Sequence, residues 1–173
     1  ALALALKGEP GAIQRAIGAF TGIWRRFERI SDKDGILVVS DYGHHPTAVR
    51  ATLEAARSFY PGRRIVLCFQ PHQHNRTKQL FLDFIPCFDV ADALVLVEIY
   101  DVPGREAHED ADVSSLDVSD AVRHHDADRF SPRPIEYARD PEAALEILHR
   151  WKKKGDIIIV MGAGDVYRIA ERV

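Results

Sequence analysis

Apolar residues recur at helical spacing in several stretches of the chain. Between Glu9 and Phe20 they stand at positions i, i+3, i+4 and i+7, which is typical of a helix with one apolar face. Proline at a first helical position favours helix starts at Pro46 and Pro141, and Asp140 adds a capping side chain. The pattern predicts helices over Glu9 to Phe20, Pro46 to about Tyr60, about Arg76 to Phe88 (with Pro86 kinking or ending it), Leu116 to His125 and Asp140 to about Trp151, and a short helix ending near Val173.

Short continuous apolar runs separate these helices. Such runs are typical of strands covered on both faces. They occur over Ile36 to Val39, Arg64 to Phe69, Ala93 to Ile99 and Asp156 to Met161. Two weaker strands are also expected. The alternating stretch Gly22 to Ile30 predicts one, followed by a turn over Ser31 to Gly35, and the other is a short strand near Ile135 to Tyr137.

The alternation of strands and helices predicts the fold class. Buried strands that alternate with one-faced helices indicate an α/β domain of three layers, with a mostly parallel sheet of about six strands. The length of 173 residues fits one domain better than two. Ligands bind such sheets at the carboxyl ends of the strands, so the loops that follow the strands are the first place to look for chemistry.

Charge and composition narrow the class of partner. The formal net charge is −3, which gives no electrostatic reason to expect nucleic acid or an anionic membrane. The longest apolar runs are about six residues, well short of the roughly 20 that span a bilayer. Cys68 and Cys87 stand among apolar residues, so we expect small core side chains in a reducing compartment rather than a disulfide.

The first residues form an alternating Ala-Leu stretch from Ala1 to Leu6, and Lys7 and Gly8 follow it. Lysine in a last turn and glycine just after it are typical of a helix end. We therefore interpret residues 1–8 as the end of a helix that begins upstream, in a chain cut from a longer protein.

Three loops that follow predicted strands carry polar chemistry. The loop Asp41 to Pro46 holds an aspartate and two histidines, which are suited to metal binding, to acid–base catalysis or to contacts with phosphate or carboxylate. The loop Gln70 to Arg76 ends on an arginine at a predicted helix start, where free N–H groups and a guanidinium would favour an anion. Gly162 to Asp165 is the third loop.

Two common site types fit these loops poorly. A zinc site from His44, His45, His72 and His74 lacks the usual short Cys/His spacings and the His-Glu-x-x-His motif. Gly162 and Gly164 begin like a dinucleotide fingerprint, but Tyr167 stands where the third glycine belongs. We therefore expect no metal held by this chain. The glycines are interpreted as allowing a tight turn between a strand and a helix.

Four motifs together resemble the C-terminal domain of the Mur ligases, in the same order along nearly the whole chain. They are Arg25-Arg26-Phe27-Glu28, Asp41-Tyr42-Gly43-His44-His45-Pro46-Thr47, Phe69-Gln70-Pro71-His72 and Gly162-Ala163-Gly164-Asp165. The second is highly specific. Within the family, the motifs are most similar to the branch that adds L-alanine to UDP-N-acetylmuramate. The paralogous murein tripeptide ligases carry Phe-Ala in place of Tyr42-Gly43 and lack the Phe69 to His72 run.

The resemblance implies the Rossmann-like third domain of a cytoplasmic ligase of peptidoglycan precursor synthesis. In this family the first domain binds the UDP sugar, the central domain binds ATP and Mg²⁺, and the third brings the amino acid. ATP phosphorylates a lactyl carboxylate, and the amine of L-alanine attacks the acyl phosphate. Residues 9–173 would then be the third domain, inactive alone, and residues 1–8 the connection from the central domain.

The same resemblance implies roles for seven residues. Arg26 and Asp41 would contact the nucleotide, with Asp41 at the ribose hydroxyls. The reacting end would be lined by Tyr42 and by two catalytic histidines, His44 and His45. His72 and Arg76 would hold the amino acid near the acyl phosphate.

The chain departs from the family pattern at Gln73, where the family usually has an arginine. A neutral amide thus replaces a planar cation that can bind a carboxylate with two hydrogen bonds. Either Arg76 alone holds the carboxylate of alanine, or Lys78 or His74 helps, or the substrate is another amino acid or a peptide. The alternative to a ligase domain is a non-catalytic α/β module that binds a small anion or a metal.

Overall fold

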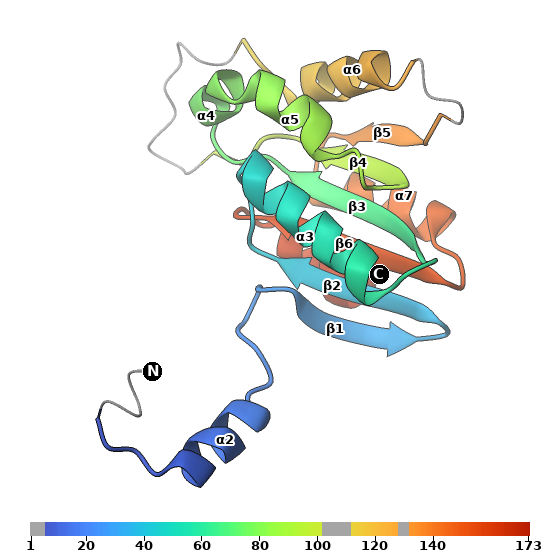
Figure 1. The fold of residues 1–173 in the computed structure, drawn as a ribbon. Helices are drawn as coiled ribbons and strands as arrows, with labels where there is room; N and C mark the ends of the chain where they lie inside the picture. The colour runs from blue at the N-terminus through green and yellow to red at the C-terminus, as the bar shows by residue number, and fades with distance from the viewer. Residues whose placement is uncertain (1–5, 102–111, 128–131) are drawn as a thin grey trace.

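The computed structural model describes residues 6–101, 112–127 and 132–173 (Figure 1). Six strands form one sheet in the order β1-β2-β6-β3-β4-β5. Only β1 is antiparallel to its neighbour, and the other four pairings are parallel. The strands are β1 Glu28–Lys33, β2 Ile36–Asp41, β3 Arg64–Gln70, β4 Ala93–Val97, β5 Ile135–Ala138 and β6 Asp156–Gly162. The mostly parallel sheet of six strands is confirmed.

Helices cover both faces of the sheet, as Figure 1 shows. The helices are α2 Pro10–Gly18, α3 Pro46–Phe59, α4 His74–Gln79, α5 Phe81–Cys87, α6 Ser115–His125, α7 Pro141–Trp151 and the 3₁₀ helix η1 Val166–Arg172. One face packs against α3, α5 and α6, and the other packs against α7 and η1. The three-layer α/β fold is therefore also confirmed.

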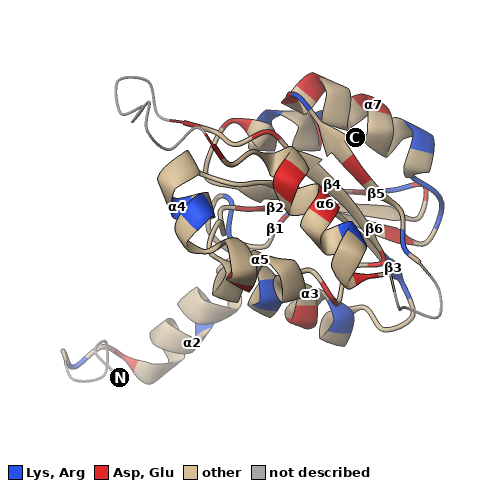
Figure 2. Cartoon of the chain, turned by 90° about the horizontal axis from the view of Figure 1, so that it is seen from above, with Lys and Arg blue, Asp and Glu red and all other residues tan. Residues whose placement is uncertain are grey.

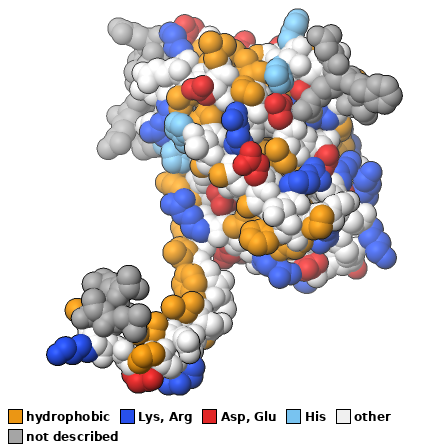
Figure 3. All heavy atoms as spheres, in the orientation of Figure 1, with side chains coloured by type: hydrophobic (Ala, Val, Ile, Leu, Met, Phe, Trp, Pro, Cys, Tyr) orange, Lys and Arg blue, Asp and Glu red, His pale blue; other side chains and the backbone are white. Residues whose placement is uncertain are grey.

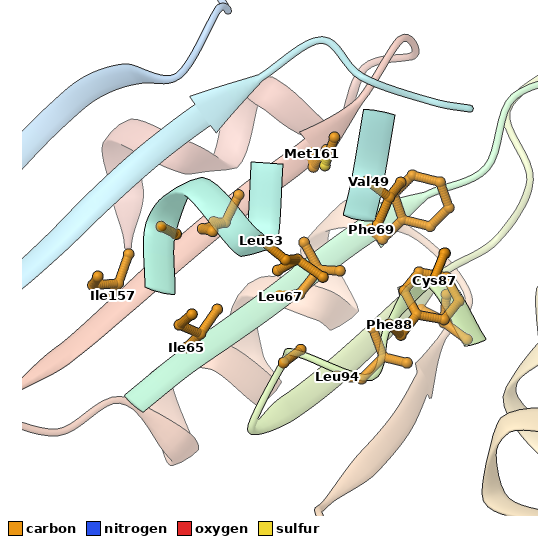
Figure 4. Close-up of a cluster of buried hydrophobic side chains, with 14 of the residues drawn as sticks. Val49, Leu53, Ile65, Leu67, Phe69, Cys87, Phe88, Leu94, Ile157 and Met161 are labelled. Carbon is orange, nitrogen blue, oxygen red and sulfur yellow. The ribbon is translucent and has the colours of Figure 1, made fainter. Parts of the chain in front are cut away.

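Alternate residues of each central strand enter two separate cores. In β3, Ile65, Leu67 and Phe69 join the cluster under α3 and α5, part of which is shown in Figure 4. Val66 and Cys68 point the other way, to the cluster under α7 and η1. Burial of one such aliphatic or aromatic side chain is worth about 1.5–3 kcal/mol. Burial on both faces explains why these strands read as unbroken apolar runs.

The cysteines lie in these cores as free thiols, Cys68 in one and Cys87 in the other. Burial raises the pKa of Cys68 to about 12. The pKa of Cys87 is also raised, chiefly by burial. Both thiols are therefore protonated at neutral pH and act as small apolar side chains.

The strand predicted over Gly22 to Ile30 is wrong in its first part. β1 begins at Glu28, because Arg25 and Phe27 have φ of 53° and 48°, which bends the chain instead of extending it. The strand runs further than expected, to Lys33. The turn is then only Asp34 and Gly35, with φ of 54° and 76°, the geometry of a tight hairpin.

The single helix predicted over Arg76 to Phe88 is two helices in the structure. The backbone of Leu80, with φ −102° and ψ 12°, leaves the helical region and separates α4 from α5. This bend turns Phe84 and Cys87 toward the core. Pro86 does not break the helix at its own position and lies in the last turn of α5.

Helix α2 forms where the sequence predicts it but stands away from the sheet (Figure 1). None of its residues is buried, and Ile17 and Phe20 on its apolar side are 70% and 64% exposed. Residues 1–5, which hold most of the expected helix end, lie outside the described residues. In the described part of the chain, no helix combines the length and apolar character needed to cross a bilayer.

Candidate active site

The three polar loops lie at one edge of the sheet. In the register of the parallel strands, Asp41 pairs with Met161 at the end of β2 and Gln70 pairs with Gly162 at the end of β3. The loop after β4 joins them through an isolated bridge between His72 and Tyr100. The sequence argument that placed these loops together is therefore correct.

A row of rings in contact forms the middle of this edge. The ring of Tyr42 meets His44 edge-on at 5.6 Å between centroids, and His44 lies 5.5 Å from His72. His72 in turn stacks on Tyr100 at 5.9 Å. His44 and His72 come from loops about 30 residues apart in sequence, so the fold itself creates their contact.

Both histidines of this contact have a lowered pKa. Burial is the main cause for His44, and Arg76, His45 and Arg26 add to it, against an opposing hydrogen bond with the carbonyl of Tyr42. For His72 burial again comes first, followed by His44 and Arg76. The two imidazoles are therefore neutral at pH 7 and able to accept a proton or a hydrogen bond.

Arg76 lies on α4 close enough to affect the pKa of both histidines. Figure 2 shows the basic residues of α4 at this end of the molecule, and Figure 3 shows histidine side chains reaching the surface beside basic ones. Arg76 is half-buried. It is the third residue of α4, not the helix start that the sequence predicted.

The N-terminus of α4 is partly occupied by an acidic side chain. α4 has only six residues and starts at His74. The main-chain N–H of His74 donates to Asp101 at 3.2 Å, and the ring of His74 pairs with the same carboxylate. The first N–H of the helix is thus already bound to an acidic side chain, so the predicted anion site rests chiefly on the guanidinium of Arg76.

Asp41 and Arg26 lie next to the rings. The carboxylate of Asp41 accepts hydrogen bonds from the main-chain N–H groups of Phe27 at 2.8 Å and Gly43 at 2.7 Å, and the residue is only 8% exposed. Arg26 is exposed, and its guanidinium lies 5.3 Å from the ring centre of Tyr42. Asp41 therefore shapes the loop, while Arg26 is free to reach outward.

His45 does not join His44 and His72. It caps α3, where its Nδ1 accepts the main-chain N–H of Thr47 at 3.2 Å. It also lines a separate cavity of about 240 Å³, together with Pro46, Thr47, Arg50, Asp83 and Pro86. The two histidines of the motif thus face different surroundings, although the sequence grouped them.

We expect His45→Asn to keep the stability of the chain, because asparagine also caps helices well. His45→Ala removes the cap and should lower the free energy of unfolding by about 0.5–2 kcal/mol. Urea unfolding of both variants measures this difference. Equal stability of the two variants would show that the cap bond to Thr47 contributes nothing.

Three comparisons with known proteins bear on this site. The sequence profile of the Mur ligase, glutamate ligase domain, matches residues 25–164. The chain belongs to the Mur ligase family. Those residues include all four motifs except Asp165, the last residue of the last one.

Curated relatives and a solved structure agree with this assignment. The UDP-N-acetylmuramate–L-alanine ligase of Solidesulfovibrio magneticus is 42% identical over 159 residues, which are 92% of this chain and 33% of that protein. The enzyme of the same name from Geobacter sulfurreducens is 40% identical over 171 residues, 99% of this chain and 35% of the relative. This Mur ligase chain thus spans about a third of the length of the curated relatives it matches.

The fold is similar to that of a UDP-N-acetylmuramate–alanine ligase from Thermotoga maritima. The TM-score is 0.77 with 21% sequence identity, and the match covers 99% of this chain and 34% of that structure. The Rossmann-like architecture expected for the third domain of a Mur ligase is confirmed.

Sequence reasoning missed the roles of three side chains, of which Arg25 and Gln70 belong to the Mur ligase motifs and Tyr100 follows β4. Arg25 is buried, and Tyr100 carries the ring that stacks on His72. Gln70 is 3% exposed and ties β3 to the last loop, because its amide donates to Asp165 and accepts the N–H of Val166. The two adjacent arginines and the Phe-Gln-Pro-His run indicated that Arg25 and Gln70 matter but not what they contact, and no motif pointed to Tyr100.

Close contacts explain the glycines of the last motif better than a tight turn does. A Cβ on Gly164 would lie 2.4 Å from the ring of Tyr100 and 2.5 Å from the amide oxygen of Gln70. Gly162 has φ of 155° and lies against the carbonyl of Gln70. The glycines thus let the loop after β3 and the loop after β4 meet the end of β6.

The four histidines considered for zinc do not converge on one point. His44 lies against His72, His74 pairs with Asp101, and His45 caps α3. Within the described ranges, one group of three side chains has metal-ligand spacing, namely Asp89, His125 and Asp126. It lies by the start of β4, away from the polar loops, and Asp126 is paired there with Arg133.

Proposed function

We propose that this chain is the amino-acid-presenting domain of a longer, ATP-dependent ligase that joins L-alanine to UDP-N-acetylmuramate in peptidoglycan precursor synthesis. The observation that carries the proposal is 40–42% identity along 92–99% of the chain to ligases of that name. The clustering of Arg76, His44, His72 and Tyr42 at one sheet edge supports it. The UDP sugar, L-alanine and the other domains of the same protein are its partners, in the cytoplasm.

Arg76 would hold the carboxylate of the incoming amino acid. It is a cation beside both His44 and His72, and a guanidinium binds a carboxylate through charge-assisted hydrogen bonds. Gln73 at the start of α4 brings no second charge to this point. With Tyr42 and His72 as walls, the site offers one charged contact and several ring faces, which suits a small amino acid.

His44 would accept the proton that the substrate ammonium must lose before its nitrogen can attack. Its pKa is lowered chiefly by burial, so a neutral imidazole is present at pH 7. The proton moves from the ammonium to the imidazole, and the free amine keeps the electron pair for the new bond. His72, at 5.5 Å, would hold the amine in place, while His45 is turned toward its own cavity.

ATP would supply the phosphoryl group that activates the carboxylate, and this chain would contact it through Arg26. An exposed guanidinium over Tyr42 fits a phosphate or a ribose. Asp41 fits a ribose less well, because it is nearly buried and already accepts two N–H bonds, although a carboxylate has further lone pairs. No cluster of Mg²⁺-type ligands lies at this edge among the described residues, so we assign Mg²⁺ to the central domain.

Gln73 is the reason to consider a second class of substrate. The family arginine at this position is absent here, so a ligase that adds a different amino acid or a peptide is the alternative within the same fold. The full-length protein should therefore be incubated with ATP, Mg²⁺, UDP-N-acetylmuramate and one amino acid at a time. We expect product and phosphate with L-alanine. Equal or faster turnover with another amino acid, or none with any, would contradict the proposal.

The 173-residue chain alone should not hydrolyse ATP and should bind it more weakly than about 100 µM. That threshold corresponds to about −5.5 kcal/mol, which is too much for the few polar contacts that Arg26 and Asp41 provide. Calorimetric titration and a phosphate-release assay measure both properties. Tighter binding, or turnover that survives repurification, would place more of the nucleotide site in this chain than we propose.

A further inference from the structure

Arg25 is buried among aromatic rings next to the candidate site. The residue is 4% exposed. Its guanidinium carbon lies 4.3 Å from the ring centre of Tyr167, 4.8 Å from that of Tyr42 and 5.4 Å from that of Trp24. Such distances are within the range of cation–π attraction. One side chain thus contacts residues from the segment before β1, the end of β2 and η1.

The same guanidinium is fixed by hydrogen bonds to the end of β6. Its Nη2 donates to the carbonyl of Gly162 and, at 3.3 Å, to that of Gly164. The main chain of Arg25 is held as well, because its carbonyl accepts the N–H of Tyr42 at 2.7 Å and its N–H donates to Glu28 at 2.8 Å. Arg25 therefore connects β1, β2 and β6 at the edge where the site lies.

Burial of an arginine at this position has a cost. Its Nε is buried and has no hydrogen-bond partner among the described residues. Burial also lowers the pKa of Arg25, an effect that Tyr42, Tyr167 and Asp41 oppose. An apolar side chain of similar length would avoid both costs, but it would leave the carbonyls of Gly162 and Gly164 without this donor. The arginine also fixes an orientation, because its planar guanidinium binds two carbonyl oxygens and contacts the aromatic rings at the same time.

The ring that Arg25 fixes leads directly to the reacting groups. The ring centre of Tyr42 also lies 5.3 Å from the guanidinium carbon of Arg26, and the ring meets His44 edge-on. We propose that Arg25 is a positioning residue. It holds the ring of Tyr42 in place, and through that ring it holds the imidazole of His44 and the side chain of Arg26 where they can contact the substrates. Its effect on catalysis rests on the proposed ligase function, whereas its effect on His44 is a property of the chain itself.

The titration of His44 tests this role without any enzymatic activity. His44 faces His72 and lies near His45, Arg26 and Arg76, and its pKa is lowered chiefly by burial. In Arg25→Met the ring of Tyr42 loses its support, so water reaches His44 and its pKa should rise toward the ordinary value. Imidazole NMR shifts of the 173-residue chain measure this. The control Arg29→Met removes an exposed arginine paired with Asp32 and should leave His44 unchanged.

Two further variants separate positioning from general loosening. Arg25→Lys keeps the charge between the rings but loses the planar guanidinium, so the pKa of His44 should shift less and in the same direction. In a Tyr42→Leu background the ring is already gone, so Arg25→Met should add no further shift to His44. An unchanged His44 titration in folded Arg25→Met, or an equal further shift in the Tyr42→Leu background, would overturn the proposal. If Arg25→Met does not fold, an unshifted His44 in Arg25→Lys overturns it.

Activity of the full-length protein gives the second readout. Arg25→Met should lower kcat/KM about ten-fold, because a small misplacement of reacting groups is costly, and Arg25→Lys should restore part of the loss. Arg29→Met should keep full activity. A wild-type protein without ligase activity would contradict the proposed function alone, while a shifted His44 would still support the positioning role.

Discussion

Arg76→Ala in the full-length ligase should raise the KM for L-alanine about 10- to 150-fold. A charge-assisted hydrogen bond to a carboxylate is worth roughly 1.5–3 kcal/mol, which corresponds to that range. Arg76 is the cation whose charge lowers the pKa of both His44 and His72, and Gln73 provides no second one. If the contact is equally strong in the ground state and the transition state, the loss appears in KM and not in kcat. Steady-state kinetics at saturating ATP and UDP sugar measure it.

Lys78→Ala is the matched control on the same helix. Lys78 is two residues further along α4, where its ammonium pairs with Asp112 at 2.9 Å. Because this charge is already partnered, the variant should change the KM for alanine little. A loss in Lys78→Ala as large as that in Arg76→Ala would show that the carboxylate is held by both. A raised KM for ATP with an unchanged KM for alanine would contradict the assignment of Arg76.

The departure at Gln73 gives the reverse variant. Gln73 has φ of 68°, and its main chain is held by Tyr100 and by the hydroxyl of Thr77. Its side chain makes no hydrogen bond within the described residues, so arginine there loses no recorded contact. Gln73→Arg should keep activity or lower the KM for alanine. A marked loss of alanine use in this variant would indicate that the site is built for a different substrate.

The fold followed from the sequence because its strands are buried on both faces. A run such as Ile157 to Met161 predicts a central parallel strand, and the cap at Asp140 and the first-turn proline at Pro46 placed the helix starts. Edges were harder. The alternation from Gly22 to Ile30 looks like a strand, but the left-handed backbone of Arg25 and Phe27 depends on contacts with β6 and β2 that no local pattern contains.

The site was predicted as a set of loops but not as a set of contacts. The rule for parallel sheets brought the loops after β2, β3 and β6 together correctly. It could not show that His44 meets His72 while His45 turns to cap α3, because adjacent residues in a loop have no fixed period. Nor could it show that α4 starts two residues earlier than expected, since Asp101, which binds its first N–H, follows a different strand.

Gly164→Ala should disturb both the stability of the chain and the candidate site. A Cβ at this position would lie 2.4 Å from Cγ and 2.6 Å from Cβ of Tyr100, and 2.5 Å from the amide oxygen of Gln70. Overpacking of this kind costs about 1–3 kcal/mol. For a chain of this length, each kcal/mol lowers Tm by about 2–4 °C. Thermal unfolding followed by circular dichroism measures the loss.

Gly164→Ala should lower the rate of the ligase by more than its loss of stability explains. Tyr100 is the ring on which His72 stacks, and its main chain holds Gln73 at the entry to α4, so its displacement moves the whole amino-acid side of the site. A shift of about 1 Å can cost on the order of 100-fold in rate. Gly18→Ala is the control, because a Cβ on this exposed helical glycine meets nothing within 4 Å and should be neutral or mildly stabilising. Full activity at 25 °C in a Gly164→Ala enzyme with a lowered Tm would show that Tyr100 is merely structural.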